Sequence, residues 1–107
     1  MKEPCVYILA SQKNGTLYIG VTSNMAERLF QHQHGTIKGF TKDHNVKRLV
    51  YMERLDTMPI AIQREKSLKR WKRQWKIDLI EKHNPDWREL SPLTGEQCLM
   101  SVPLSQI

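Results

Sequence analysis

The sequence predicts a small α+β domain, with a three-stranded antiparallel sheet flanked by helices in the order β-β-α-β-α(-α). Two short apolar segments near the N-terminus are joined by an Asn-Gly turn signal. A third apolar segment follows an amphipathic stretch, and a long helical pattern comes after it. Three strands need a helical layer to bury one face of their sheet, and 107 residues are enough for one such domain.

The first two strands form a predicted hairpin. Residues 5–11, CVYILAS, are short, apolar and rich in strand-forming side chains, which is typical of a buried strand. Asn14 and Gly15 both tolerate positive φ and therefore favour a tight turn. Residues 16–22, TLYIGVT, are the expected returning strand.

A helix is expected over residues 25–34. Ser23 or Asn24 can cap its N-terminus, and Asn24 with Glu27 three residues later resembles a capping box. Gly35 is the expected C-terminal stop. The apolar stripe of this helix is expected to consist of Met25, Ala26, Leu29 and Phe30.

The second half of the chain is predicted to be one strand followed by helix. Residues 35–45 form a polar loop, and residues 46–53 are the third strand. Thr57 opens a helical pattern over residues 58–83, which is long enough to be either one helix or two helices with a bend. Pro85 disfavours helix at the residue before it.

The expected domain spans residues 1–90, and residues 91–107 are expected to be a loosely ordered C-terminal tail because no hydrophobic period continues there. Cys5 and Cys98 form neither a zinc spacing nor a disulfide framework. No apolar segment approaches the length of a signal core or a membrane span. We therefore expect a cytoplasmic protein without a membrane partner.

The chain is strongly basic, with a net charge of +6 and a pI near 9.6. This balance favours a polyanionic partner, although a merely solvated basic face gives the same count. The long helical pattern interleaves its positive charges with Trp71 and Trp75, which suggests either a phosphate-contacting surface or a solvated face over core tryptophans. The candidate nucleic-acid-binding residues are Lys42, Lys69, Arg70, Lys72 and Arg73.

One carboxylate stands out in the same helical pattern. Ala61, Leu68, Trp75 and Leu79 follow helical spacing and are expected to face the core. Glu65 lies on that stripe or at its edge. Ionised carboxylates are seldom buried unless paired or bound to a metal. Glu65 is therefore a residue at the stripe edge whose carboxylate reaches solvent, a partner of a nearby Lys or Arg, or a metal ligand.

Four further residues gather around the hairpin and the first helix. Arg28 and His32 are four residues apart and therefore share one helix face, beside the strands that carry Tyr7 and Tyr18. Each one alone has an ordinary explanation, as a surface residue or as a core tyrosine with a solvated hydroxyl. Their combination favours a functional site.

The segments CVYIL and LYIG, an Arg and a His on the next helix, and AIQREKSLKRWKR together resemble a GIY-YIG nuclease domain. The resemblance runs from about residue 6 to about residue 90. It is closest to small single-domain members related to the nuclease domain of the bacterial excinuclease. The first motif departs from the family pattern, because Cys5 replaces its glycine.

The resemblance implies a role for each matching residue. Tyr7 would be the general base or would position the attacking water, and Tyr18 would line the site. Arg28 would stabilise the charge that develops on the phosphate. His32 would relay a proton or contact the phosphate. Glu65 would bind one divalent metal, usually Mg²⁺ or Mn²⁺, with waters and the substrate phosphate completing the coordination.

The resemblance therefore implies a metal-dependent endonuclease that hydrolyses DNA, including branched or damaged DNA as in DNA repair, with RNA still open as a substrate. The family often has an asparagine after the acid, and Asn84 is the candidate here, at a longer spacing. The alternatives are a non-catalytic nucleic-acid-binding module that keeps the nuclease fold and a protein-interaction domain. A monomer or a weak homodimer is expected.

Overall fold

The structure is a computed structural model that describes residues 3–34 and 45–91. Its strands form one antiparallel sheet in the order β2-β1-β3, which confirms the predicted fold class. The elements along the chain are β1 (Cys5–Ala10), β2 (Leu17–Thr22), α1 (Met25–Gln33), β3 (Arg48–Arg54), α3 (Met58–Arg70) and α4 (Arg73–His83).

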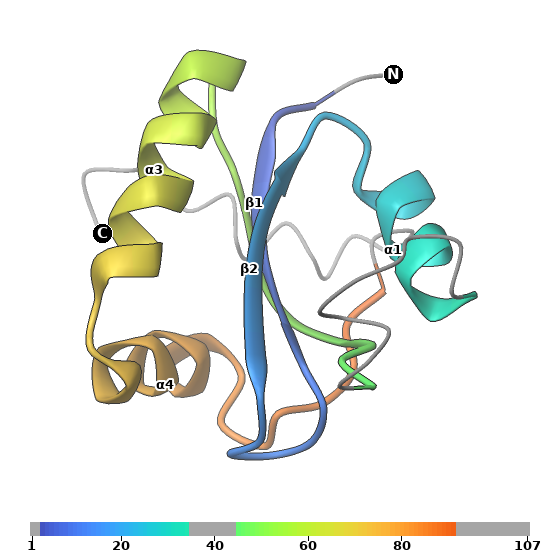
Figure 1. Ribbon diagram of the computed structural model, residues 1–107, viewed down its shortest axis with the longest axis vertical. Coiled ribbons are helices and arrows are strands. Elements are labelled where there is room, and N and C mark those ends of the chain that lie inside the picture. Colours follow the sequence, from blue (N-terminus) through green and yellow to red (C-terminus); the bar gives the residue numbers. More distant parts are fainter. Residues whose placement is uncertain (1–2, 35–44, 92–107) are drawn as a thin grey trace.

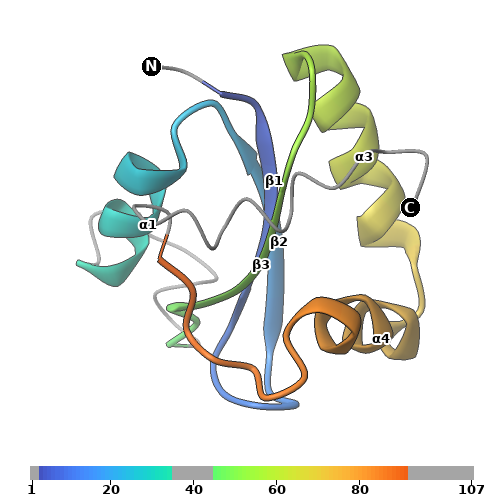
Figure 2. The same cartoon turned by 180° about the vertical axis from the view of Figure 1, so that it is seen from behind.

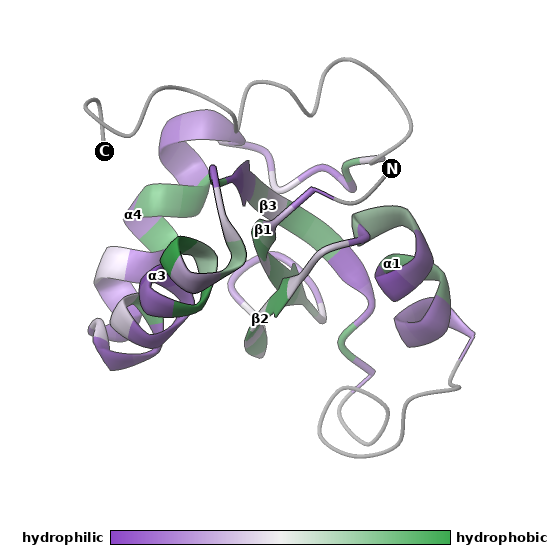
Figure 3. Cartoon of the chain, turned by 90° about the horizontal axis from the view of Figure 1, so that it is seen from above, coloured by the Kyte–Doolittle hydropathy of each residue, from purple (hydrophilic) through white to green (hydrophobic). Residues whose placement is uncertain are grey.

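The sheet lies between two helical layers. Helix α1 covers one face, and α3 and α4 cover the other (Figures 1 and 2). Seen from above, the largely apolar strands lie in the middle, between α1 on one side and α3 and α4 on the other (Figure 3). The central strand β1 is buried along its whole length, whereas β2 is an edge strand with partly exposed residues. Helices therefore cover both faces of the sheet, whereas the sequence required a helical layer on only one face.

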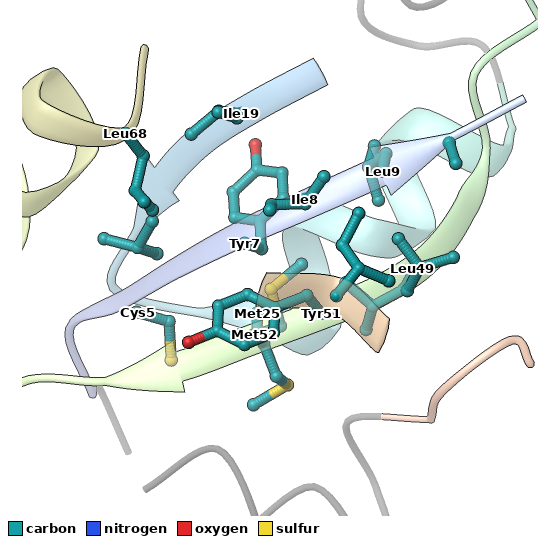
Figure 4. Packing of buried hydrophobic residues seen from close by; sticks show 14 of the residues in the cluster. Cys5, Tyr7, Ile8, Leu9, Ile19, Met25, Leu49, Tyr51, Met52 and Leu68 are labelled. Carbon is teal, nitrogen blue, oxygen red and sulfur yellow. The ribbon is translucent and has the colours of Figure 1, made fainter. Parts of the chain in front are cut away.

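The core fills the space between the strands and the helices. Figure 4 shows its side chains around the sheet, with Leu68 reaching from α3 toward the strands. Trp87, which the sequence patterns did not identify, is 1% exposed and is one of the largest buried side chains. Its backbone has a φ of 55°, and its indole Nε1 donates a hydrogen bond to Glu81 Oε2 at 2.8 Å. The segment after α4 thus closes the core.

The predicted turn and cap residues have the expected roles. Asn14 has a φ of 60° in the β1–β2 turn. Asn24, and not Ser23, caps α1, since its Oδ1 accepts a hydrogen bond from the backbone N–H of Glu27 at 3.1 Å. Thr57 caps α3 in the same way through the N–H of Ile60, at 3.3 Å. Local side-chain hydrogen bonds therefore fix where both helices begin.

The long helical pattern forms two helices. Trp71 and Lys72 both have a ψ of 151°, which ends α3 and begins α4 in a new direction. The expectation that Trp75 faces the core was therefore wrong: its side chain is 51% exposed, and the partly buried Trp71 packs against the core instead. A helical spacing that is counted across a break between two helices no longer predicts which residues face the core.

The expected place of Phe30 in the α1 stripe was also wrong. Phe30 is 57% exposed and stacks on the ring of His34 with their centroids 3.9 Å apart. Met25 and Leu29 are buried as expected. No helix in the ranges 3–34 and 45–91 is long and apolar enough to cross a membrane. Lys42, Cys98 and nearly all of the predicted tail lie outside those ranges.

Candidate active site

The pairing of β1 with β2 builds the centre of the site. Tyr7 lies directly opposite Gly20, and Tyr18 is two residues along the same strand and hence on the same face. The Tyr7 ring is 2% exposed and lies over the Gly20 backbone. A Cβ atom at position 20 would overlap the Tyr7 hydroxyl and lie 2.9 Å from the ring carbon Cε1. Only glycine leaves room for Tyr7 in this position.

Helix α1 brings His32 to the same place. The hydroxyl of Tyr7 shares a hydrogen bond with His32 Nε2 at 3.1 Å, and His32 is 3% exposed. Its ring centroid lies 5.9 Å from that of Tyr7 and 5.5 Å from that of Tyr18. The two tyrosine centroids are 6.2 Å apart. Three of the predicted site residues are therefore in mutual contact at one edge of the sheet.

Burial and the neighbouring charged groups determine the protonation of this cluster. Burial raises the pKa of Tyr7 well above its usual value, and the neighbouring Tyr18 hydroxyl raises it further. Arg28 lowers the pKa of Tyr7, but burial outweighs this effect. Burial and the Arg28 guanidinium lower the pKa of His32. Near neutral pH the phenol therefore keeps its proton, and the imidazole is neutral and able to accept one.

Glu65 approaches the cluster from the opposite layer. Its helix, α3, packs against β1 and the edge strand β2, and the charge of Glu65 is close enough to Tyr7 to raise the pKa of that hydroxyl. The Glu65 side chain is 13% exposed, and its Oε2 lies 2.6 Å from Lys69 Nζ. Glu65 is thus at the edge of the α3 stripe and paired with a lysine, an arrangement that was among those expected for it.

Glu65 is suited to bind a hard divalent cation, although a single carboxylate provides few ligand atoms. Within residues 3–34 and 45–91, no three His, Cys, Asp or Glu side chains come together in a group able to hold a metal ion. Mg²⁺ is often bound through only one or two carboxylates, because waters and a substrate phosphate complete its octahedral coordination. The carboxylate oxygens of Glu65 are therefore of the kind that fits such an ion.

The structure gives Asn84 a structural role. It is 2% exposed and caps α4. Its Nδ2 donates to the carbonyls of Val50 at 3.1 Å and Arg88 at 2.8 Å, and its Oδ1 accepts from the Arg88 N–H at 3.0 Å. Both ends of the amide are therefore engaged in holding the chain after α4 against β3.

The predicted basic surface divides into residues with different partners. Arg73 Nη2 donates to the carbonyls of Asn14 at 2.8 Å and Gly15 at 2.6 Å, so its guanidinium holds the β1–β2 turn. Arg70 and Lys72 are exposed. The Lys72 ammonium lies 5.6 Å from the centroid of the exposed Trp75 ring. Lys72 and Arg70 are therefore better placed than Arg73 to meet a phosphate.

A buried polar cluster on the α3 face of the sheet escaped the sequence patterns. Glu53 is fully buried, and its Oε1 accepts hydrogen bonds from the Tyr51 hydroxyl at 2.9 Å and from Arg64 Nε at 3.1 Å. Trp71 covers the Arg64 guanidinium, which lies 5.3 Å from the indole centroid. The alternation along β3 does place Tyr51 and Glu53 on one face, but the strand pattern does not reveal an arginine from another element. Since Arg64 precedes Glu65, this pair anchors α3 beside the candidate site.

Comparisons with known proteins agree with this arrangement. Residues 3–78 match the GIY-YIG catalytic domain. A UPF0213 protein of Staphylococcus saprophyticus is 35% identical over 80 residues, which cover 75% of this chain and 96% of that protein. A UPF0213 protein of Syntrophus aciditrophicus is 36% identical over 87 residues, covering 80% and 98% of the two chains.

A solved structure is similar over nearly its whole length. The solution NMR structure of a UPF0213 protein from Bacillus halodurans superposes with a TM-score of 0.52 at 25% sequence identity, covering 86% of this chain and 97% of that one. The tyrosine pair, the fold and the matched residues all lead to one conclusion. The chain belongs to the GIY-YIG catalytic domain family, a family of nucleases.

Proposed function

We propose that this chain is a metal-dependent endonuclease that hydrolyses phosphodiester bonds in DNA. The observation that carries the proposal is the 3.1 Å hydrogen bond between the Tyr7 hydroxyl and His32 Nε2, beside Tyr18 at the sheet edge. Phosphodiester hydrolysis needs a group that takes a proton from the attacking water. A neutral imidazole that is hydrogen-bonded to a phenol can supply such a proton-accepting group.

In this proposal Tyr7 and His32 act as a pair. The raised pKa of Tyr7 disfavours a preformed tyrosinate. Instead, the Tyr7 oxygen accepts the proton of the water while its own proton passes to His32 Nε2, so that no isolated phenolate forms. The lowered pKa of His32 keeps its imidazole neutral near pH 7, so that the ring can accept this proton.

The remaining site residues would bind the charged groups of the reaction, namely the phosphates and the divalent cation. The guanidinium of Arg28 is suited to bind two phosphate oxygens side by side and to stabilise the negative charge that develops there. Glu65 would hold the divalent ion. When bound, Mg²⁺ or Mn²⁺ supplies Lewis-acid stabilisation of the phosphate and the leaving oxygen. The exposed Arg70 and Lys72 would contact flanking phosphates, in a way that weakens with salt.

The test is cleavage of supercoiled plasmid and of branched and damaged DNA in the presence of Mg²⁺ or Mn²⁺. We expect the wild type to nick the plasmid, and Glu65→Ala and Arg28→Ala to lose at least about 100-fold in rate, as when a group that stabilises the transition state is removed. Gln63→Ala is the matched control, because Gln63 is exposed on the same helix as Glu65. Equal cleavage by all four proteins would indicate a contaminating nuclease. An RNA of the same sequence decides whether the activity is restricted to DNA.

Two observations favour a second candidate, a nucleic-acid-binding module without activity. Cys5 stands where the first motif has glycine, and the Tyr7 side chain is 2% exposed, so water reaches its hydroxyl only if the site opens. Such a module would bind DNA or RNA with an affinity that falls steeply with salt. It would cleave neither substrate with Mg²⁺ or Mn²⁺, so the cleavage assay separates the two candidates.

A further inference from the structure

The proposed metal-binding carboxylate of the candidate site is neutralised by a neighbouring ammonium group. Lys69 Nζ lies 2.6 Å from Glu65 Oε2, one helical turn further along α3. The Glu65 side chain is 13% exposed, whereas that of Lys69 is 53% exposed. The lysine is thus the more exposed member of the pair, and the carboxylate is the more buried one.

We propose that Lys69 is an exchangeable counterion of Glu65: it neutralises the carboxylate in the metal-free protein and moves away when a divalent cation binds. The inference rests on the proposed function, because it takes Glu65 as the metal ligand. Two cations compete for a single carboxylate, and their mutual repulsion prevents both from occupying it closely. The lysine therefore lowers the affinity of the site for metal.

The exchange is physically accessible. An ion pair four residues apart on a helix, with one member exposed to water, contributes little to stability, so a divalent ion does not meet a strong competitor. The lysine side chain has four flexible methylene groups, and it can leave Glu65 without any change in the α3 backbone. Its ammonium then stays at the rim of the site, beside the exposed Arg70, where it can contact a substrate phosphate.

This exchange makes a prediction that a simple helix-stabilising pair does not make. Removal of the Lys69 charge should strengthen metal binding and weaken nucleic-acid binding at the same time. A pair that only stabilises the helix would instead leave Glu65 less well positioned, so its loss would weaken or leave unchanged the binding of metal. The direction of the change in metal affinity therefore distinguishes the two roles.

The experiment titrates the full chain with Mn²⁺ alone and follows the paramagnetic broadening of backbone amide NMR signals around Glu65. The variants are Lys69→Met, Glu65→Gln and, as the matched control, Lys66→Met, which removes an exposed charge next to Glu65 on the same helix. We expect the Mn²⁺ Kd of Lys69→Met to fall about three- to tenfold and that of Lys66→Met to change less than about twofold. Glu65→Gln should lose the broadening.

A second measurement follows binding of a fluorescent DNA without divalent metal at several salt concentrations. Lys69→Met should bind more weakly because it loses one positive charge, but its salt slope should stay nearly unchanged, since in the metal-free protein the Lys69 ammonium is paired with Glu65 and not with a phosphate. An Mn²⁺ Kd for Lys69→Met that equals or exceeds the wild-type value overturns the inference, and so does broadening that persists in Glu65→Gln. If Lys69→Met gains metal affinity but the wild type cleaves no DNA, the nuclease proposal fails and the exchange stands. If the wild type cleaves DNA but Lys69→Met gains no affinity, only the exchange fails.

Discussion

The hydroxyl of Tyr7 lies over the backbone of Gly20, in space that a side chain at position 20 would fill. The two residues are directly paired across β1 and β2. The glycine of the second motif therefore serves the tyrosine of the first, by letting its ring reach across the edge strand toward His32. The relation is steric, so a substitution that adds a single methyl group at position 20 tests it.

Gly20→Ala should displace the Tyr7 ring and break its hydrogen bond to His32. We expect a loss of about 1–3 kcal/mol in the free energy of unfolding, typical of overpacking, and at least a tenfold loss of any nuclease rate. Urea denaturation and plasmid nicking measure these two effects. In a Tyr7→Leu background the same alanine should destabilise far less, and an equal effect in both backgrounds would show that the clash is elsewhere.

Acidification should destabilise the fold through His32. Burial and Arg28 lower its folded pKa below the usual 6.5, so below about pH 6.5 the unfolded chain binds a proton that the folded chain does not. Stability is therefore retained above that pH and falls as the pH drops. The Tm of wild type and His32→Gln, compared at about pH 7 and pH 5.5, should show a smaller drop in the variant. Some drop remains, because burial also lowers the pKa of His83.

The buried pair of Glu53 and Arg64 should be sensitive to removal of one partner. Glu53 is fully buried and the Arg64 side chain is 17% exposed, so Arg64→Met leaves an uncompensated carboxylate in the core. We expect a loss of about 3–5 kcal/mol in the free energy of unfolding, measured in urea. The double variant Glu53→Met/Arg64→Met should recover much of it. A loss below about 1 kcal/mol for Arg64→Met would mean that water reaches Glu53.

Lys72 and Arg73 should differ although they are neighbours in sequence and both exposed. Lys72→Ala removes a charge that faces solvent, so it should lower the salt slope of DNA binding by about one and leave Tm unchanged. Arg73→Ala removes two hydrogen bonds to the Asn14–Gly15 turn, so it should lower Tm and leave the salt slope nearly unchanged. Binding isotherms and thermal melts of both variants decide this, and a reversed pattern would contradict the assignment.

Much of the fold could be predicted from the sequence because its determinants are local. The Asn14–Gly15 turn and the caps Asn24 and Thr57 act within three or four residues, and they fall where short-range rules place them. Trp75 was misplaced because the break at Trp71 and Lys72 depends on tertiary packing, and no helix-breaking residue marks it.

The candidate site was predictable to a different degree. Tyr7, Tyr18 and His32 could be grouped because two tyrosine motifs and a helical spacing pointed to one sheet edge. Glu53 could not be identified, since a glutamate in a strand reveals neither its burial nor an arginine 11 residues away in sequence on another element. Long-range pairs of this kind are set by the packing of layers.

The break between α3 and α4 places Trp71 and Trp75 in different environments, so the tryptophans of this chain can serve as optical probes. The three tryptophans of the sequence sit in three environments: Trp87 is 1% exposed, Trp71 is partly buried against the core, and Trp75 is 51% exposed. Intrinsic fluorescence from Trp87 should report unfolding, while Trp75 should respond to a bound polyanion. Single-tryptophan versions made by Phe substitution could therefore follow folding and binding separately, without an added dye.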